Sequence, residues 1–183
     1  KAYGILYQAP RKPFLRALVD GLNEGARVIR RRAVFLFASL AVVLAGAFFA
    51  ASILEWRPDM RSYVVPEQME ELFDAWKSGK HEPRAGSESL AALGMYSSNN
   101  PMVSIIAGTV AAGTFGLGTV LLLWQNGSIL GALSHDTASV GKLDHLLVSI
   151  APHGATELTG MIVSGAAGLV LGWALISPGR RTR

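Results

Sequence analysis

The chain has 183 residues, of which 50% are hydrophobic and only 16% are charged, and its formal net charge is +4. A soluble domain of this size needs a more highly charged surface, so the composition argues against one. The chain has no Cys, which excludes disulfides and thiolate metal sites. Three long stretches contain no Asp, Glu, Lys, Arg or His, and they cover residues 33–54, 89–134 and 158–179.

These uncharged stretches are long enough to cross a bilayer as helices. About 20 apolar residues span the hydrocarbon core in an α-helix, whereas the strands of a β-barrel alternate in polarity over about 10 residues. The sequence contains no such alternation, and a helix satisfies its own backbone hydrogen bonds in lipid. The sequence therefore predicts an all-α fold, a polytopic helical membrane bundle of about four membrane segments with short interfacial or surface helices.

Basic residues gather near both ends of the chain. Residues 1–32 carry eight Lys or Arg against two acidic residues, residues 55–88 carry five basic and eight acidic ones, and three arginines lie within 179–183. Because the basic clusters adjoin apolar spans, positive-inside sorting explains them better than nucleic-acid binding does. We expect both ends of this chain in the cytoplasm and no nucleic-acid partner.

The cytoplasmic N-terminal region, residues 1–32, is expected to contain an amphipathic helix over 13–30, with Pro13 in its first turn. Apolar and basic side chains recur there at helical spacing, namely Phe14, Leu18, Leu22 and Ile29 on one side and Arg16, Arg27 and Arg30 on the other. Two alternatives stay open. The helix either lies in the headgroup layer, attracted by anionic lipid, or packs on the rest of the protein as a plain cytoplasmic helix.

The first span is predicted over 33–54, with Trp56 at the membrane interface. The following extracytoplasmic loop, residues 55–98, contains a predicted short helix over 66–78. Pro66 opens this helix, acidic residues favour its first turn, and an apolar stripe runs along one side. Three alternatives stay open for the short helix: it lies on the outer bilayer surface, it covers the bundle, or it binds a partner.

Residues 99–178 are expected to form a Gly-rich core of three membrane segments. The second span is predicted over 102–124, and Asn126-Gly127 is expected to break the helix after it. Charged and His residues between 135 and 145 interrupt the third segment, so it is a broken helix or a re-entrant pair of half-helices; Asp136 and Asp144 are expected to be solvated loop residues. The last span is predicted from Pro152-His153-Gly154 to Ile176. A tail over 179–183 is expected to continue in the full-length protein, and its arginines favour a crossing third segment.

Small residues recur every four positions in the last two segments, at Gly127 and Gly131 and at Gly160, Ser164, Gly168 and Gly172. Faces of this kind let helices approach closely in lipid. We expect them to form a helix-packing motif, either within one chain or between copies, and we expect a homo-oligomer, most simply a dimer.

Three polar residues, His135, His153 and Glu157, are expected near the seam where the Gly-lined faces meet, as an intramembrane polar site. His153 and Glu157 are one helical turn apart, and three interpretations stay open: a hydrogen-bonded structural pair, a proton or ion path, and a metal site. The zincin motif, a Ser-His-Asp order, a phosphate-binding loop and a dinucleotide fingerprint are all absent from the sequence. We therefore assign no catalytic residue, no metal ligand and no cofactor.

One order of motifs is characteristic: Asn99-Asn100, a Gly-rich span, Asn126-Gly127 with Gly131, Pro152-His153-Gly154-x-x-Glu157-Leu158, and Pro178-Gly179. Over residues 30–183 it resembles the stage II sporulation protein M family, above all its longer bacterial members. The resemblance implies a multi-span protein of the bacterial plasma (inner) membrane. It also implies partners, either the cell-wall hydrolases called stage II sporulation proteins D and P or a MoxR-type AAA ATPase system.

The sequence thus predicts a non-enzymatic membrane scaffold or localisation factor that organises envelope partners and contacts lipids. One alternative is a permease or an ion- or proton-conducting subunit, which the interrupted third segment favours. A weaker alternative is an intramembrane metal-dependent enzyme, which would need three or more metal ligands and an open coordination position.

Overall fold

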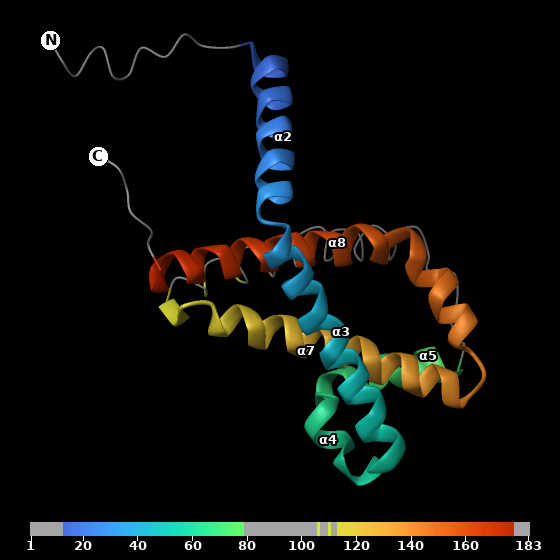
Figure 1. Cartoon of the computed structure of the whole chain (residues 1–183). Helices are drawn as coiled ribbons and strands as arrows, with labels where there is room; N and C mark the ends of the chain where they lie inside the picture. The colour runs from blue at the N-terminus through green and yellow to red at the C-terminus, as the bar shows by residue number, and fades with distance from the viewer. Residues whose placement is uncertain (1–12, 79–105, 107–109, 111–112, 178–183) are drawn as a thin grey trace, which may run out of the picture. The chain divides into compact units, whose positions relative to one another are not determined.

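The computed structural model describes residues 13–78, 106, 110 and 113–177 (Figure 1). All regular structure in those residues is helical, which agrees with the all-α fold expected from the sequence. The chain divides into two compact units, residues 1–33 and 34–183.

The first unit consists of α2 (Phe14–Arg31). Pro13 precedes it with φ −52° and ψ 139°, and a proline there needs no backbone donor. Arg32 leaves helical geometry, with φ −114° and ψ 23°, and ends the helix. The side chains of α2 are almost all exposed.

The second unit begins at Val34, one residue into α3 (Ala33–Trp56), a helix of 24 residues that is apolar on all sides and long enough to cross a membrane. After it the chain turns back through four short elements: η1 (Pro58–Met60), α4 (Arg61–Val64), η2 (Glu67–Met69) and α5 (Glu70–Ser78). Of the three alternatives for the short helix predicted over 66–78, the structure has it covering the bundle. Its Phe73 is 0% exposed and lies in one apolar cluster with Leu54, Ala132 and Leu146.

Two long helices follow, α7 (Leu117–Ser139) and α8 (Leu143–Ile176), joined by a tight turn in which Gly141 has φ 70°. The prediction of a helix break at Asn126-Gly127 is wrong. Asn126 donates its side-chain amide to the Leu122 carbonyl inside α7, and Gly127 faces the backbone of Val43. The prediction of one interrupted third segment is therefore also wrong. The first half of that segment belongs to α7, and its second half belongs to α8.

The actual break before α7 lies at Phe115 and Gly116, which have φ 51° and 90°. Glycine adopts this left-handed conformation without steric cost. The predicted second span, 102–124, is thus divided: residues 117–124 start α7, and most of its first half lies outside the described residues. The last span also starts earlier than expected, since α8 runs through Pro152, but the window apolar enough to span a membrane begins at Gly154. Figure 1 shows that α8 changes direction in its N-terminal half, and a helix-interior proline removes one backbone hydrogen bond.

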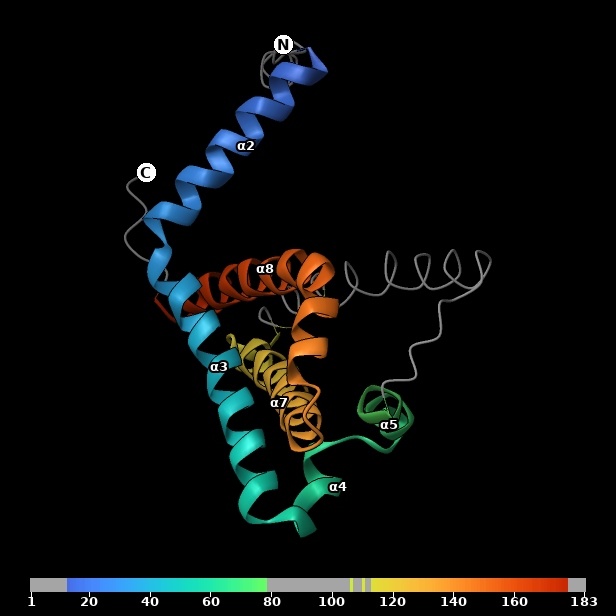
Figure 2. The ribbon, with the colours of Figure 1, turned by 90° about the vertical axis from the view of Figure 1, so that its right-hand side faces the viewer.

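Helices α3 and α7 run in the same direction (Figure 2). Gly127 lies against Val43, Gly131 lies against Ala47, and His135 reaches Glu55, so contacting positions increase together along both helices. Helix α8 runs opposite to α7, with Gly165 near Leu123 and Gly172 near Gly116. A hydrogen bond from Ser39 Oγ to the Ile162 carbonyl, 2.9 Å long, joins α3 to α8.

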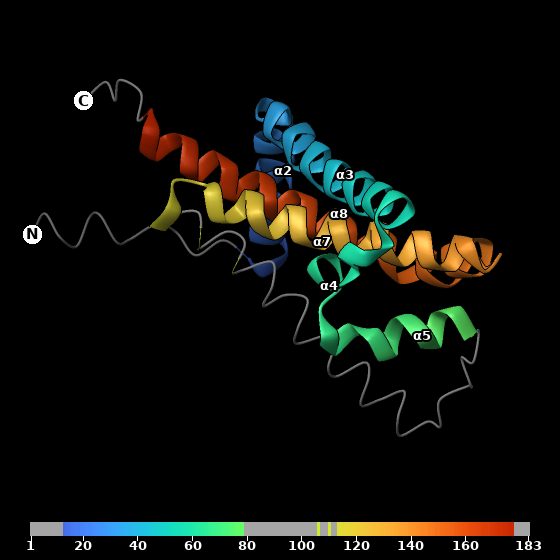
Figure 3. The same ribbon diagram turned by 90° about the horizontal axis from the view of Figure 1, so that it is seen from below.

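Three of the described helices are long and apolar enough to cross a membrane, namely α3, α7 and the Gly154–Ile176 part of α8. Figure 3 shows α4 and α5 beside α7. The apolar contacts of α5, above all those of Phe73, pack the segment from α4 to α5 against α7. The C-terminal ends of α3 and α7 therefore share one side of the bundle with α4 and α5. Polar side chains gather on that side.

Candidate functional site: a charged cluster at the ends of α3 and α7

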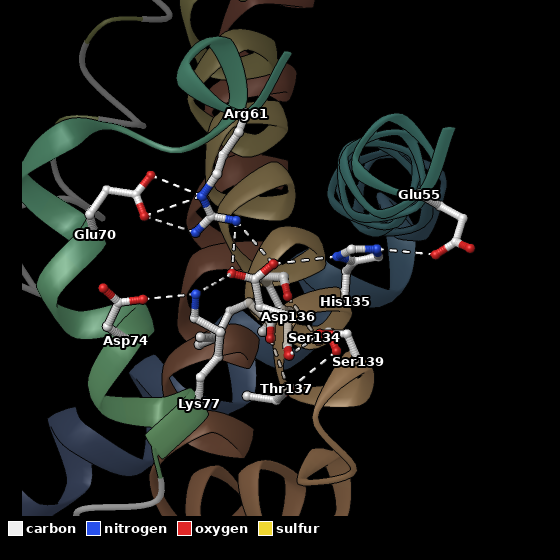
Figure 4. A network of polar contacts seen from close by, with 12 residues as sticks. Glu55, Arg61, Glu70, Asp74, Lys77, Ser134, His135, Asp136, Thr137 and Ser139 are labelled. Atoms are coloured by element: carbon white, nitrogen blue, oxygen red, sulfur yellow. Dashed lines mark hydrogen bonds and ion pairs between the residues drawn. The ribbon is translucent and has the colours of Figure 1, made fainter. Parts of the chain in front are cut away.

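Seven ionisable side chains meet where α3 and α7 end, and we call them the Asp136 cluster: Glu55, Arg61, Glu70, Asp74, Lys77, His135 and Asp136 (Figure 4). They come from α3, α4, α5 and α7, up to 81 positions apart in sequence. The cluster therefore exists only because the tertiary structure brings these helix ends together.

Asp136 is the buried centre of the cluster, with 5% of its surface exposed. Its Oδ1 accepts a hydrogen bond from Arg61 Nη1 at 3.0 Å. Its Oδ2 lies 2.8 Å from the same nitrogen and 3.8 Å from Lys77 Nζ, but no described group donates a well-aligned hydrogen bond to it. A buried carboxylate needs such compensation, because removing a charge from water costs several kcal/mol.

Arg61 joins Asp136 to α5. Its guanidinium makes a bidentate pair with Glu70, with Nε 3.0 Å from Oε1 and Nη2 2.8 Å from Oε2. It also lies 5.6 Å from the centre of the Phe73 ring, within the range of a cation–π contact. The Glu70 hydrogen bonds raise the pKa of Arg61 above its ordinary value, with a further contribution from Asp136, and burial opposes the shift. Arg61 is therefore a permanent cation between two carboxylates.

Lys77 adds a second contact between α5 and the end of α7. Its Nζ lies 2.7 Å from Asp74 Oδ1, and this hydrogen bond lowers the pKa of the Asp74 carboxyl. Lys142, in the turn after α7, donates from Nζ to the Lys77 backbone carbonyl at 2.9 Å. The C-terminal end of α5 is thus tied to the turn between α7 and α8.

His135 connects the cluster to α3. Its Nε2 lies 3.2 Å from Glu55 Oε2, and its Nδ1 lies 3.4 Å from Asp136 Oδ1. A neutral imidazole donates from one nitrogen only, whereas a protonated imidazole donates from both. The ring therefore satisfies both carboxylates at once only when it carries a proton.

Of the three residues predicted to form an intramembrane polar site, only His135 is seen in the Asp136 cluster. His135 takes part in the cluster; Glu157 is exposed on α8 and is not among the cluster residues; the side chain of His153 lies outside the described part of the chain. No group of three or more His, Cys, Asp or Glu side chains within the described residues is arranged to hold a metal ion.

The expectation that Asp136 is a solvated loop residue is wrong. Asp136 lies in the last turn of α7, on the same face as buried Ala132 and Ser128, four and eight positions earlier. This spacing would have indicated a buried position had one continuous helix been assumed through Asn126-Gly127. The pairing of Arg61 with Asp136 could not be predicted in this way, because no pattern in the loop predicted over 55–98 indicates a contact with a residue 75 positions later.

The small residues mostly form close contacts within the chain. A side chain at Gly127 or Gly131 would meet the α3 backbone, and one at Gly172 would lie 2.7 Å from the Gly116 Cα. Gly168 is buried and Ser164 is half-buried. Gly160 differs from them, since the space beside it is open.

A pocket of about 230 Å³ lies between α3, α4 and α7. Its lining includes Phe49 and Trp124, whose ring centres are 5.3 Å apart, together with Tyr63, Gln125 and Ser128. Ser128 Oγ is buried and has no hydrogen-bond partner among the described residues. The pocket therefore combines aromatic walls with one unsatisfied hydroxyl.

The family model described as Stage II sporulation protein M matches residues 33–183 of the chain. No curated protein and no solved structure matches. The matched region contains α3, the short elements after it, α7 and α8, and so the whole Asp136 cluster.

Proposed function

This chain belongs to the stage II sporulation protein M family, and on that premise we propose that it is a non-enzymatic membrane scaffold that organises envelope partners. The three apolar helices and the family together indicate a membrane protein. The observation that carries the proposal is the Asp136 cluster. It holds α4 and α5 on the ends of α3 and α7 through Arg61, so a fixed surface stands outside the spans.

A fixed surface is what a scaffold needs, because ordering a docking segment in advance removes an entropic cost of binding. The side of α5 that faces away from the bundle carries exposed Glu71, Leu72 and Asp74. The partners that we propose are proteins of the envelope, and the cell-wall hydrolases or the MoxR-type ATPase system implied by the family are the first to examine. We also propose that the chain forms a homo-oligomer, and the open space beside Gly160 supports a helix contact there.

We expect Glu71→Lys to lower the recovery of envelope partners about tenfold, which corresponds to about 1.4 kcal/mol of binding free energy. The measurement is quantitative mass spectrometry of proteins that co-purify with the tagged full-length protein from native membranes. Asp59→Lys is the control, because it reverses another exposed acidic charge, in η1 and therefore outside the α5 surface. A second copy with a different tag, recovered in the same experiment, reports self-association. Equal recovery with both variants would argue against the α5 surface as the docking site.

We further propose four membrane crossings in the bacterial plasma membrane, with both ends of this chain in the cytoplasm. The support is the parallel packing of α3 and α7. If both helices cross in the same direction, the chain has to return across the membrane between them, which makes four crossings in total.

Single-Cys labelling tests this topology cleanly, because the chain has no native Cys. We expect Gln68→Cys and Val140→Cys, both exposed and near the shared ends of α3 and α7, to react with an impermeant thiol reagent added outside intact cells. Arg16→Cys in α2 should react only after the membrane is opened. Labelling of Gln68→Cys and Val140→Cys from opposite sides would disprove the parallel crossing.

A second candidate function, a permease or conducting subunit, is favoured by the pocket between α3, α4 and α7 with its unsatisfied Ser128 hydroxyl. Solute uptake by proteoliposomes that contain the purified protein, lost in Ser128→Val, would favour this candidate over the scaffold.

A further inference from the structure

We propose that α2 is an in-plane membrane helix, whose apolar face inserts into the anionic leaflet on the side of the bilayer where α3 begins. The inference concerns lipid binding and does not depend on the scaffold function. It rests on three features of residues 14–33: the segregation of side chains around α2, the width of its apolar face, and its covalent distance from the first span.

The polar side chains of α2 are confined to one side of the helix. At about 100° per residue, all of them fall within an arc of roughly 120°: Arg16, Asp20, Asn23, Glu24, Arg27, Arg30 and Arg31. The remaining arc is apolar and open to the surroundings, with Phe14 78% and Leu15 72% exposed, and Leu18, Val19 and Val28 about half exposed. Large apolar side chains at this density on one face mark a contact surface.

The width of the apolar arc decides between a lipid surface and a second helix. A two-helix seam uses a narrow stripe of apolar positions, whereas the apolar side of α2 occupies roughly two thirds of the circumference. A broad apolar side opposite an arginine-rich side is the pattern of helices that lie in the headgroup layer. The arginines outnumber Asp20 and Glu24 by four to two, so the polar arc carries a net charge of +2 and favours anionic lipid.

The position of α2 in the chain brings it to the bilayer. It ends at Arg31, and α3 begins at Ala33, so a single residue separates the helix from an apolar span. Arg32 has non-helical dihedral angles, which allow the chain to change direction there. Arg30, Arg31 and Arg32 are therefore held at headgroup depth by the start of α3, and an in-plane α2 removes its apolar side chains from water.

The test uses the full chain in lipid vesicles, with a fluorophore on a single introduced Cys and bromine-labelled acyl chains as quenchers. Leu18→Cys places the probe in the apolar arc, and Asn23→Cys is the matched control in the polar arc of the same helix. We expect strong quenching at position 18 and little at position 23 in vesicles of phosphatidylcholine with phosphatidylglycerol. Replacing Arg27, Arg30 and Arg31 together by Gln should weaken the quenching at position 18, since each arginine near an anionic surface contributes about a fivefold preference, from about 1 kcal/mol.

Three results would overturn the inference. The first is equal quenching at both positions, or none at either. The second is quenching at position 18 that is the same in phosphatidylcholine alone, which would remove the role of anionic lipid. The third is an efficient disulfide between two Leu18→Cys chains together with loss of quenching, which would assign the apolar face to a second copy instead.

Discussion

Replacing Arg61 with Met should lower the free energy of unfolding by about 3 kcal/mol, because it leaves the buried Asp136 carboxylate without its main partner. The hydrogen bond at 3.0 Å and the ion-pair contact at 2.8 Å both disappear. Lys77 at 3.8 Å and His135 at 3.4 Å remain, but neither replaces a guanidinium that also holds Glu70. The measurement is unfolding of the purified protein in mixed micelles by titration with a denaturing detergent.

The matched control is Arg57→Met. Arg57 makes a similar two-pronged contact with Asp59, at 3.0 and 2.8 Å, but both side chains are more than half exposed. Exposed ion pairs contribute about 0–1 kcal/mol, so the free energy of unfolding of this variant should be close to that of the parent protein. The double variant Arg61→Met/Asp136→Leu should recover most of the lost stability, because an apolar pair of similar volume replaces the ion pair. If Arg61→Met were no more destabilising than Arg57→Met, the cluster would not be what holds α4 and α5 in place.

The second large effect is expected at the crossing of α3 and α7. A methyl group at Gly131 would overlap backbone atoms of Ala47, and backbone cannot move aside as a flexible side chain can. Gly131→Ala should therefore force the two helices apart and lower the free energy of unfolding by about 2 kcal/mol or more. The same detergent titration measures it.

Gly160→Ala is the control for Gly131→Ala. It makes the same chemical change in another membrane helix, at a position with open space, so the stability of one chain should hardly change. Self-association, read by mass photometry in nanodiscs, should weaken in Gly160→Ala if copies meet at this glycine. Equal destabilisation by the two variants would mean that the close contact of α3 with α7 does not support the fold.

Composition and hydropathy were sufficient for the all-helical fold class and for the location of the first apolar helix. Hydropathy over a window is a property of composition, so an uncharged stretch such as 33–54 marks a span wherever it lies in the fold. The corresponding helix, α3, covers Ala33–Trp56. The order of motifs around Asn126-Gly127 and Pro152-His153-Gly154 also identified the family that the match over 33–183 shows.

The positions of the helix breaks follow from tertiary packing and not from local turn signals. Asn-Gly is a strong turn signal in water, but in α7 Gly127 is used for close approach to Val43, and Asn126 bonds within its own helix. The turn lies instead at Phe115-Gly116, where Gly116 both adopts a positive φ and contacts Gly172. Local turn preference is worth about 1 kcal/mol, which is less than the packing of two helices along their length.

The charged cluster also depended on the tertiary structure. Arg61 and Asp136 are 75 positions apart, and nothing local indicates that one compensates the other. Their pairing follows from the parallel packing of α3 and α7 and from the burial of Phe73, which brings α4 and α5 against the end of α7. Composition and periodicity determined which segments are helical and apolar, because those properties are local. Which charges are buried together was decided by the packing of distant helices, because the cost of burying a charge depends on what lies beside it in space.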